Sequence, residues 1–410
     1  MRMVPESVSY WQRISPLFSL STDLPNVSDV AIIGGGLLGA ATCYWLARAG
    51  VHTVLLERRA LADGATGRNG GFVRAGTAGS YSEAIARLGP QTARAVMDIT
   101  YENRALLRQV LQEEEISCDY REPSALQLAL TEDQSEQQRQ EVALLQAEGF
   151  SAQWLERAQV QAMINTPLVP EILGGRFLPE QGLLHSARLV QGLVHAALLH
   201  GATAYQAEVS EIERDGANVR LQTSQGSLVA QTVIVAINAW TSTLLPELTN
   251  VIVPVLEQMQ AYEAIDPIFS MALSVHMNAG EYMQQTPSGT LLIGGCGSVA
   301  PNAGVGVWES VPTTPVQKAI EKIVPRIFPL LAPQLRVVQC WAGILGCTQD
   351  MHPIVDAAPD VPGVFFVGGF TGHGMPFGMR FGQLLATVAT DRFLPSALRP
   401  FRLDRPSLGR

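Results

Sequence analysis

Hydrophobic residues between positions 29 and 57 fall into three successive patterns. Val30–Ile33 form a continuous apolar run after Asp29, which predicts a strand buried on both faces. Residues 37–49 are rich in Ala and Leu, lack proline and end at Gly50, which predicts a helix. Residues 52–56 predict a second strand, which ends at Glu57. This order predicts a βαβ unit with parallel strands.

Three later stretches carry apolar residues at helical spacing. Residues 82–115 predict one or two amphipathic helices, and residues 186–200 predict another. Residues 131–148 predict a helix that Thr131 caps and Gly149 ends. Its polar face, rich in Glu and Gln, is typical of a helix that packs one side on a core.

The remaining apolar runs predict strands of two kinds. Residues 209–230 alternate charged and apolar positions and are interrupted by Asp-Gly and Gln-Gly, which predicts a small antiparallel ribbon. The continuous runs 232–237 and 364–367 predict buried parallel strands. Residues 251–265 and 290–293 predict strands of a second sheet. Because the two kinds interleave, we expect one domain assembled from separated segments and a second domain inserted into it.

The glycines that follow the first strand have a spacing with chemical meaning. Gly34, Gly36 and Gly39 give the G-x-G-x-x-G pattern, in which the glycines permit a tight turn, close approach of a pyrophosphate and close helix packing. Glu57 ends the second strand about 20 residues later, where an acceptor for ribose hydroxyls is expected. Glu57 would repel a 2′-phosphate, although Arg58 beside it would attract one. A glycine turn without a ligand is the alternative interpretation.

Composition narrows the classes of partner and mechanism. The chain has 410 residues, of which 47% are hydrophobic, enough for a large core. The net charge of -9 and the pI of about 5.3 argue against a nucleic-acid partner. Lys318 and Lys322 are the only lysines, so any mechanism with an active-site lysine must use one of them.

Cysteine use and hydropathy indicate the compartment. The five cysteines are dispersed without a C-x-x-C pair, which favours free thiols in a reducing compartment and argues against a zinc site. We expect no metal site. We also see neither an apolar signal-peptide segment near the start nor an apolar run long enough to span a membrane. A cytoplasmic location is therefore expected.

Residues 1–28 form a segment of their own. Tyr10, Trp11 and Phe18 stand among Ser and Pro, which favours an arm whose aromatic side chains dock on the main body. Attachment to a membrane surface is the alternative.

Taken together, the motifs resemble the D-amino-acid oxidase superfamily of FAD-dependent oxidoreductases. The resemblance rests on the glycine triplet with Glu57, the Gly-Ala-Thr-Gly-Arg-Asn-Gly-Gly loop at 64–71, Val-Ala-Ile-Asn-Ala-Trp at 235–240 and Gly-Gly-Phe-Thr-Gly-His-Gly at 368–374. It extends from about residue 29 to residue 390. The loop and Leu-Leu-Ile-Gly-Gly at 291–295 favour the gamma-glutamylputrescine-oxidase and D-amino-acid-dehydrogenase branches.

The resemblance implies an α/β fold, with α+β character in the second domain. A Rossmann-like FAD-binding domain built from discontinuous segments would carry an inserted antiparallel-sheet substrate domain. The expected division is an arm at 1–28, an FAD-binding domain at 29–80, 151–245 and 335–410, and a substrate domain at 81–150 and 246–334.

The resemblance also implies which residues hold FAD. They come from the glycine motif and its acid, the glycine-rich loop, the adenine-side strand, the Asn-Ala-Trp stretch and the late Gly-His-Gly motif. The set is Gly34, Gly36, Leu38, Gly39, Glu57, Arg58, Thr66, Gly67, Arg68, Asn69, Gly70, Gly71, Val209, Asn238, Trp240, Gly343, Gly372, His373, Gly374 and Met375.

Two departures from relatives affect the cofactor and the electron acceptor. Covalently flavinylated relatives carry a histidine in the first glycine loop or a cysteine before the late threonine, and here Leu345 stands at the cysteine position. FAD is therefore expected to bind without a covalent link. The Gly-His-Gly motif continues with Met375 and Pro376, where sarcosine oxidases have Phe-Lys. Both oxygen and a quinone-type acceptor stay possible.

The chemistry implied by the resemblance is oxidation of a C–N bond in an amine or amino acid. Arg74 aligns with the carboxylate-binding arginine of sarcosine oxidases. A guanidinium suits this role because it can bind a carboxylate with two hydrogen bonds. Pairing with a structural acid is the alternative, and Arg380 is the second candidate. His373 is expected beside the flavin. Gln258 and Tyr262 are expected, with Gln260, on one face of a strand above it.

Other functions remain open at this level. A flavoprotein that modifies a bulky or carrier-bound substrate would share the fold, and residues 80–150 would shape its larger cavity. A flavin-binding protein without catalytic activity is the third possibility. His276 and Tyr282 lie in the predicted substrate domain, where each would contact substrate or serve only the structure.

Overall fold

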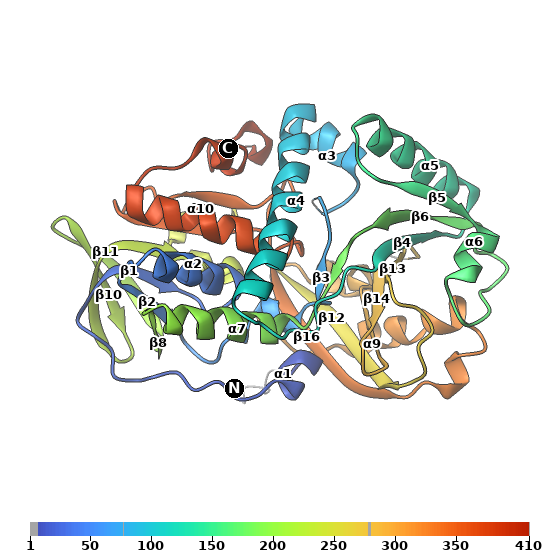
Figure 1. Ribbon diagram of the computed structural model, residues 1–410, viewed down its shortest axis with the longest axis horizontal. Coiled ribbons are helices and arrows are strands. Elements are labelled where there is room, and N and C mark those ends of the chain that lie inside the picture. The colour runs from blue at the N-terminus through green and yellow to red at the C-terminus, as the bar shows by residue number, and fades with distance from the viewer. Residues whose placement is uncertain (1–6, 77, 278–279, 410) are drawn as a thin grey trace.

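The computed structural model describes residues 7–76, 78–277 and 280–409. Its core consists of two sheets that lie side by side, with the long helix α4 (Pro90–Glu113) between them in the view of Figure 1. The α/β fold with a second, mainly antiparallel sheet confirms the fold class expected from the sequence.

The first sheet has eight strands and contains the predicted βαβ unit. Its main path consists of β17 (Ile354–Ala357), β18 (Val364–Gly368), β11 (Gly226–Val235), β1 (Val27–Ile33), β2 (Thr53–Glu57) and β8 (Thr203–Gln206). Off this path, β10 (Asn218–Thr223) pairs with β11, and β9 (Val209–Asp215) pairs with β10. From β18 to β8 the neighbours are parallel, and Ile32 of β1 pairs with Leu55 and Ile234. The ribbon β9–β10–β11 is antiparallel, as predicted.

The second sheet also has eight strands. Its order is β16 (Val337–Cys347), β12 (Val253–Ala264), β15 (Thr290–Gly294), β14 (Glu281–Gln285), β13 (Ala272–Val275), β4 (Ser124–Ala129), β6 (Gly174–Pro179) and β5 (Gln153–Glu156). Only β13 and β4 are parallel neighbours. A small separate pair, β3 (Phe72–Val73) with β7 (Gly182–Leu183), lies where the chain passes between the two sheets.

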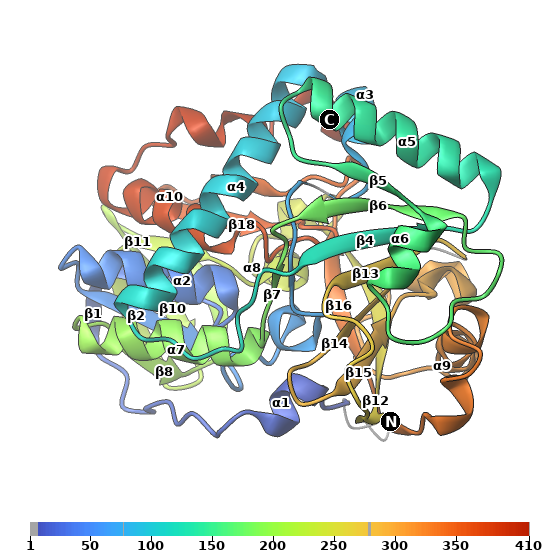
Figure 2. The same ribbon diagram turned by 45° about the vertical axis from the view of Figure 1, so that its right-hand side comes forward.

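Helices cover both sheets. Besides α4 they are α1 (Tyr10–Ile14), α2 (Leu37–Arg48), α3 (Tyr81–Leu88), α5 (Glu132–Ala147), α6 (Arg157–Ala162), α7 (Ser186–Leu199), α8 (Thr241–Leu244), α9 (Thr314–Glu321) and α10 (Gly378–Asp391). The predicted α5 has Thr131 as its N-cap, and its last turn leads to Gly149 at a φ of 83°. Figure 2 shows α5 and α6 over one end of the second sheet.

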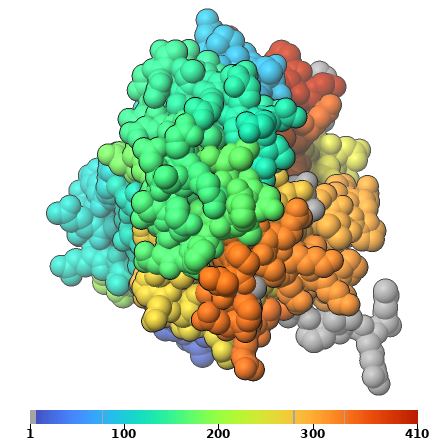
Figure 3. Space-filling view, turned by 90° about the vertical axis from the view of Figure 1, so that its right-hand side faces the viewer, coloured from blue at the N-terminus to red at the C-terminus, as the bar shows by residue number. Residues whose placement is uncertain are grey.

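Short 3-10 turns connect these elements. They are η1 (Ala65–Arg68), η2 (Asn238–Trp240), η3 (Pro246–Leu248), η4 (Gly297–Val299), η5 (Pro301–Gly304), η6 (Val324–Arg326), η7 (Ala332–Gln334), η8 (Ser396–Phe401) and η9 (Pro406–Leu408). Figure 3 shows the end of the molecule where the α5–α6 region meets the chain around α9. We find no helix in the described part of the chain that is long and apolar enough to cross a membrane.

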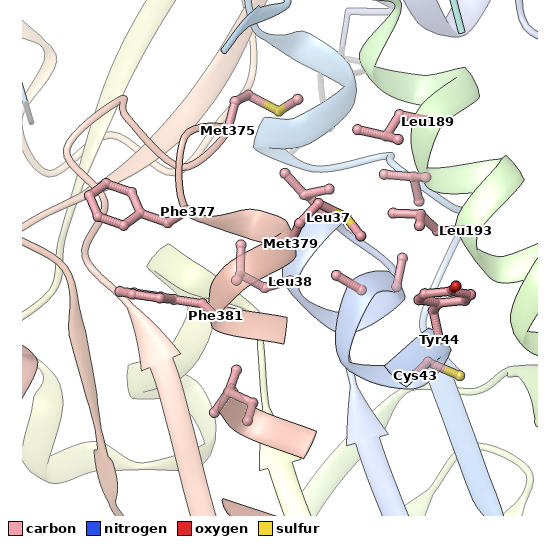
Figure 4. Packing of buried hydrophobic residues seen from close by; sticks show 14 of the residues in the cluster. Leu37, Leu38, Cys43, Tyr44, Leu189, Leu193, Met375, Phe377, Met379 and Phe381 are labelled. Atoms are coloured by element: carbon pink, nitrogen blue, oxygen red, sulfur yellow. The ribbon is translucent and has the colours of Figure 1, made fainter. Parts of the chain in front are cut away.

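Two helices from opposite ends of the chain, α2 and α10, pack tightly against each other (Figure 4). A Cβ on Gly378 would lie 2.3 Å from the side chain of Leu37, and a Cβ on Gly382 would lie 2.5 Å from that of Ala41. The two glycines therefore allow the close approach, which brings the loop before α10 next to the N-terminus of α2.

Strand pairing differs from the expected division of the chain at two places. β5 and β6 belong to the second sheet, although residues 151–245 were expected in the FAD-binding domain. β16, expected in that domain as well, pairs with β12. The reason is that β6 and β16 find their antiparallel partners in the second sheet, and the apolar pattern of a strand does not identify its partner. The division into domains stays a prediction.

The N-terminal segment docks on the body through aromatic residues, as the sequence predicted. Tyr10 and Trp11 of α1 are buried, and Ser9 caps the helix. Trp11 donates a hydrogen bond from Nε1 to the backbone oxygen of Asn69 at 2.6 Å, and Ser9 donates to that of Gly67. The segment therefore stabilises the glycine-rich loop through hydrogen bonds to its backbone.

Candidate active site

A groove runs along the carboxyl ends of β1 and β2 to the N-terminus of α2. Gly34 has a φ of 115°, and a Cβ there would lie 2.6 Å from the backbone oxygen of Ala236, so only glycine fits the turn. Helix α2 has Gly36, which lacks a side chain, as its N-cap, and the N–H of Leu37 in its first turn donates a hydrogen bond to the hydroxyl of Thr66 at 3.2 Å. Its unpaired N–H groups and positive dipole make this end of the groove suitable for a phosphate.

Glu57 stands at the end of β2 on the wall of this groove. Its carboxylate accepts hydrogen bonds from the backbone N–H groups of Gly35 (2.8 Å) and Arg59 (2.9 Å). Burial raises the pKa of Glu57 above its ordinary value, and the two N–H groups oppose that shift. The side chain is therefore fixed in place, with lone pairs left for the hydroxyl groups of a ribose.

The groove is lined by Val209 at one end and by the loop before α10 at the other. Arg58 and Trp240 also line the groove, and Arg58 lies over the ring of Trp240, 5.2 Å from its centroid. At the loop before α10 the lining consists of Gly372, Gly374 and Met375. The groove is thus long, and its two ends differ in chemistry.

At the loop before α10 the groove adjoins a cavity of about 970 Å³ on one face of the second sheet. Ala65, Asn69, Leu345, Gly372 and Met375 line both spaces. The cavity leads outward to exposed residues of α3 and α5, among them Glu83 and Gln137. Its volume is at the upper end of the range for ligand pockets, about 300 to 1,000 Å³.

Arg74 projects into this cavity from the segment after β3. We find neither a hydrogen bond nor an ion pair for its guanidinium in the described part of the chain. Burial, with a smaller contribution from the nearby charge of Arg176, lowers the pKa of Arg74 to about 10, so it is still cationic at neutral pH. Arg176 itself is occupied, because it binds Gln127 (2.7 Å) and Glu141 (3.4 Å). Arg74 is therefore free for an anionic group of a ligand.

His373 lies beside Arg74 on the cavity wall. Burial and the charge of Arg74 lower the pKa of His373 to about 4, so its imidazole is neutral at neutral pH. Its Nδ1 is buried and has no hydrogen-bond partner in the residues that the structure describes. A polar atom without a partner at this position fits a ligand with hydrogen-bonding groups.

Most of the predicted cofactor residues lie around these two spaces. The groove is lined by Gly34, Gly36, Leu38, Glu57, Arg58, Thr66, Asn69, Val209, Asn238, Trp240, Gly372, Gly374 and Met375. The cavity adds Arg68, Gly70, Gly343 and His373. Gly39, Gly67 and Gly71 line neither space, because each faces a backbone oxygen that a Cβ would approach to 2.3 Å or less. Their contribution is close packing.

The expected direction of Gln258 and Tyr262 was wrong. Their strand does border the cavity, but Gln258 bonds to Thr313 (2.9 Å) before α9, and Tyr262 bonds to Gln260 (2.7 Å) on the same outward face. The alternate residues, Glu257 and Met259, line the cavity instead. Strand alternation placed the three residues together as expected, but it did not indicate which face was inward.

Arg380 was also expected at the site and is not there. Its Nε lies 2.7 Å from Glu102 on α4, and it lines none of the spaces described above. The first turn of α10 is capped by Asn103, whose Oδ1 accepts hydrogen bonds from the N–H groups of Met379 (2.8 Å) and Arg380 (3.2 Å). One turn of helix therefore carries Arg380 away from the cavity.

Several lining residues were not selected from the sequence. In the groove they include Ala207, Glu208, Thr243 and Phe370, and in the cavity Arg176, Glu257, Glu281 and Leu345. Most come from elements that converge only in the fold, so no local signal marks them. Glu257 had one signal, which is a charged residue within an otherwise apolar and amide-rich strand. His276 and Tyr282 do line the cavity.

The groove and the cavity together define a class, that of oxidoreductases with a dinucleotide cofactor whose reactive end meets a substrate chamber. A family model for FAD-dependent oxidoreductases (DAO) matches residues 29–388. The chain is 26% identical to glycine oxidase of Geobacillus kaustophilus over 384 residues, which are 92% of this chain and 97% of the relative. It is 27% identical to gamma-glutamylputrescine oxidoreductase of Escherichia coli over 376 residues, 88% of this chain and 83% of the relative.

Solved structures show the same fold. The crystal structure of glycine oxidase from Geobacillus kaustophilus superposes with a TM-score of 0.79 at 24% identity, over 93% of this chain and 99% of that chain. L-amino acid deaminase from Proteus myxofaciens, in complex with anthranilate, superposes with a TM-score of 0.78 at 17% identity, over 98% of each chain. The chain belongs to the DAO family of FAD-dependent oxidoreductases, and its cofactor is FAD.

Proposed function

We propose that the chain oxidises the C–N bond of an amino acid or a related amine that carries a carboxylate. The observation that carries this proposal is Arg74, a cation on the wall of the cavity for which we find no partner among the described residues. Bound FAD would supply the acceptor for the hydride that leaves the carbon bearing the nitrogen. The resulting imine is then hydrolysed to an oxo product and ammonia or a smaller amine.

In this scheme the residues of the chain bind the cofactor and orient the substrate. The first turn of α2 and the loop at 64–71 would hold the pyrophosphate of FAD, and Glu57 would accept hydrogen bonds from its ribose. Arg74 holds the substrate carboxylate with two hydrogen bonds. The neutral imidazole of His373 offers a donor or an acceptor to the flavin or the substrate. Orientation of the reacting carbon over the cofactor is the main catalytic contribution of the protein.

We propose that FAD binds without a covalent link. None of the five cysteines lines the groove or the cavity as the structure describes them, and all five are free thiols. Denaturation with acid should therefore release all the flavin into the supernatant. Free thiols also support a reducing compartment such as the cytoplasm.

Relatives suggest the substrate class only in part, since their names include glycine, sarcosine and gamma-glutamylputrescine. The cavity of about 970 Å³ also favours a second candidate, which is a bulky or carrier-bound amine. In that case the reacting end would enter between α3 and α5 while the remainder stayed outside.

Anaerobic bleaching of the flavin tests the proposal. The purified holoprotein is mixed with D-amino acids, N-methyl amino acids and polyamine conjugates, and loss of the yellow absorbance reports hydride transfer. Bleaching by a carboxylated amine supports the proposal, and bleaching only by conjugates favours the second candidate. No bleaching by any of these amines would contradict both. Peroxide formation on readmission of air distinguishes oxygen from a quinone-type acceptor.

A further inference from the structure

Glu257 occupies a special place on the wall of the cavity. It pairs in register with Gly343 of β16, and two positions away Val255 pairs with Leu345. Residues opposite each other in a sheet point to the same face, so Glu257 shares the face of Leu345. Leu345 lines both the FAD groove and the cavity. The carboxylate therefore lies next to the junction where the reactive end of the cofactor meets the substrate space.

The carboxylate of Glu257 makes few hydrogen bonds with the described part of the protein. It accepts one hydrogen bond, from the backbone N–H of Gln258 at 3.1 Å. In the described part of the chain we find no ion pair for it. On its far side a Cβ on Gly297 would lie 3.3 Å from one of its oxygens, so η4 closes that direction. The open direction is the cavity.

The ionisable groups that surround Glu257 are not cationic partners. Glu281 and Tyr282 come from β14, Cys296 precedes η4, and Cys347 ends β16; all four interact electrostatically with Glu257 or with one another. Arg68 of η1 packs behind Gly343, but its guanidinium bonds to backbone oxygens of Asp63, Ser7 and Ala342. A cation that pairs with Glu257 must therefore come from a ligand.

Burial, reinforced by Glu281, raises the pKa of Glu257 to about 7. A carboxyl group in this range can exchange a proton at neutral pH, which suits a group that acts as a base. The cavity thus contains two ionisable groups for which we find no ion pair among the described residues, the cationic Arg74 and the acidic Glu257. An α-amino acid carries the complementary pair, a carboxylate and an ammonium group.

We propose that Glu257 is a further catalytic residue, which binds the ammonium group of the substrate and takes one proton from it. This inference rests on the proposed function. In the step one N–H bond breaks and its electron pair stays on nitrogen, while an O–H bond forms at the Glu257 carboxylate. No electrons pass between groups. The amine is then a free base with a lone pair, which is the form from which hydride can leave.

Binding of ligands that cannot react tests the recognition. The probes are 2-aminoisobutyrate, which has no hydrogen on its α-carbon, and isobutyrate, which lacks the amine; both are titrated into the holoprotein and followed by the flavin absorbance. Glu257→Gln should weaken 2-aminoisobutyrate by about 10- to 100-fold and leave isobutyrate within about twofold. Glu83→Gln, at the mouth of the same cavity, should change neither, since glutamine retains the capping-box contact with Ser80.

The pH dependence of flavin reduction tests the proton transfer. With the best amine from the bleaching panel, the wild-type rate at low substrate concentration should rise through a step near pH 7 as Glu257 ionises. Glu257→Gln should lack this step, and its rate should rise only as the free amine becomes abundant at higher pH. The flavin content and melting temperature of the variant establish that it is folded.

The outcomes separate this inference from the proposed function. Equal weakening of both acids by Glu257→Gln, or no weakening of either, would overturn the role of Glu257. So would a loss confined to substrates with a second, distal amine, because Glu257 would then recognise that amine. If neither acid perturbs the wild-type flavin and no carboxylated amine bleaches it, the proposed function itself fails.

Discussion

At the scale of single residues, the chemistry of the cavity is decided by charges that the protein leaves unpaired. Arg74 and Arg176 are neighbours of the same type, yet only Arg176 is held by protein groups, namely Gln127 and Glu141. The sequence identified Arg74 through its place after the glycine-rich loop. That we find no partner for Arg74 among the residues that the structure describes is a property of the fold.

Replacement of Arg74 tests its role in binding the carboxylate. Arg74→Gln should lower kcat/KM for a carboxylated amine by about 10- to 150-fold, the usual range for loss of charge-assisted hydrogen bonds. Amines without a carboxylate should be unaffected. Steady-state kinetics on both classes measure the difference, with Arg108→Gln, an exposed arginine paired with Glu122, as the matched control. An equal loss for both classes would remove Arg74 from this role.

At the scale of elements, glycines determine how closely helix, strand and cofactor approach. A Cβ on Gly39 would lie 1.9 Å from the backbone oxygen of Gly34, whereas a Cβ on Gly36 would meet only the hydroxyl of Thr66 at 3.3 Å. The same motif therefore contains one glycine needed for packing and one needed for the ligand.

Two alanine variants separate these functions. Gly39→Ala should prevent close packing of α2 on β1, so that little soluble protein with bound flavin is obtained. Gly36→Ala should give folded protein with weaker FAD binding, because the added methyl group occupies the space of the pyrophosphate. Expression yield, circular dichroism and flavin content measure the outcomes. Normal flavin content in Gly39→Ala would contradict the packing argument.

The N-terminal helix is a second element with an effect on the cofactor. Trp11→Phe retains an aromatic ring but removes the hydrogen bond to Asn69, which lines the groove. FAD affinity of the apoprotein should fall by about 2- to 10-fold, the range for loss of one hydrogen bond. Quenching of flavin fluorescence measures the dissociation constant. Tyr10→Phe, which loses only a long contact of 3.4 Å to Ser288, should leave it unchanged.

At the scale of the whole molecule, the fold lowers the pKa of four histidines. Burial is the main cause, and it lowers the pKa of His185 and His373 to about 4, that of His352 to about 3 and that of His276 below its ordinary value. Above pH 6.5 these groups are neutral in both the folded and the unfolded chain. As the pH falls below that value, only the unfolded chain takes up the protons, so acid destabilises the fold.

Unfolding by urea at several pH values tests this effect. Between pH 6.5 and pH 4, each of these histidines should lower the free energy of unfolding by up to about 1.4 kcal/mol per pH unit. The ring of His352 stacks on that of Phe401 at 4.6 Å, and the phenylalanine of His352→Phe can keep this contact. In this variant the free energy of unfolding should depend less steeply on pH, by the uptake of about one proton or about 1.4 kcal/mol per pH unit. Replacement of the exposed His52 by glutamine should leave the pH dependence of the free energy of unfolding unchanged. An unchanged slope in His352→Phe would contradict the assigned shift.

Local sequence determined the cofactor half of this protein. The glycine spacing, the apolar runs of β1 and β2, and Glu57 at the end of β2 depend on contacts within a few residues or on the period of a regular element. Their positions could therefore be derived from the chain alone, and so could the helices with clear caps, such as α5.

Tertiary structure alone decided the substrate half. Gln258 and Glu257 are neighbours on one strand, and which of them faces the cavity depends on α9 packing against the other face. Arg380 is not at the cavity because it pairs with Glu102, which lies on a helix nearly 300 positions earlier in the chain. The alternation of a strand has two equivalent phases, and a long side chain has many possible partners, so only the packed fold selects among them.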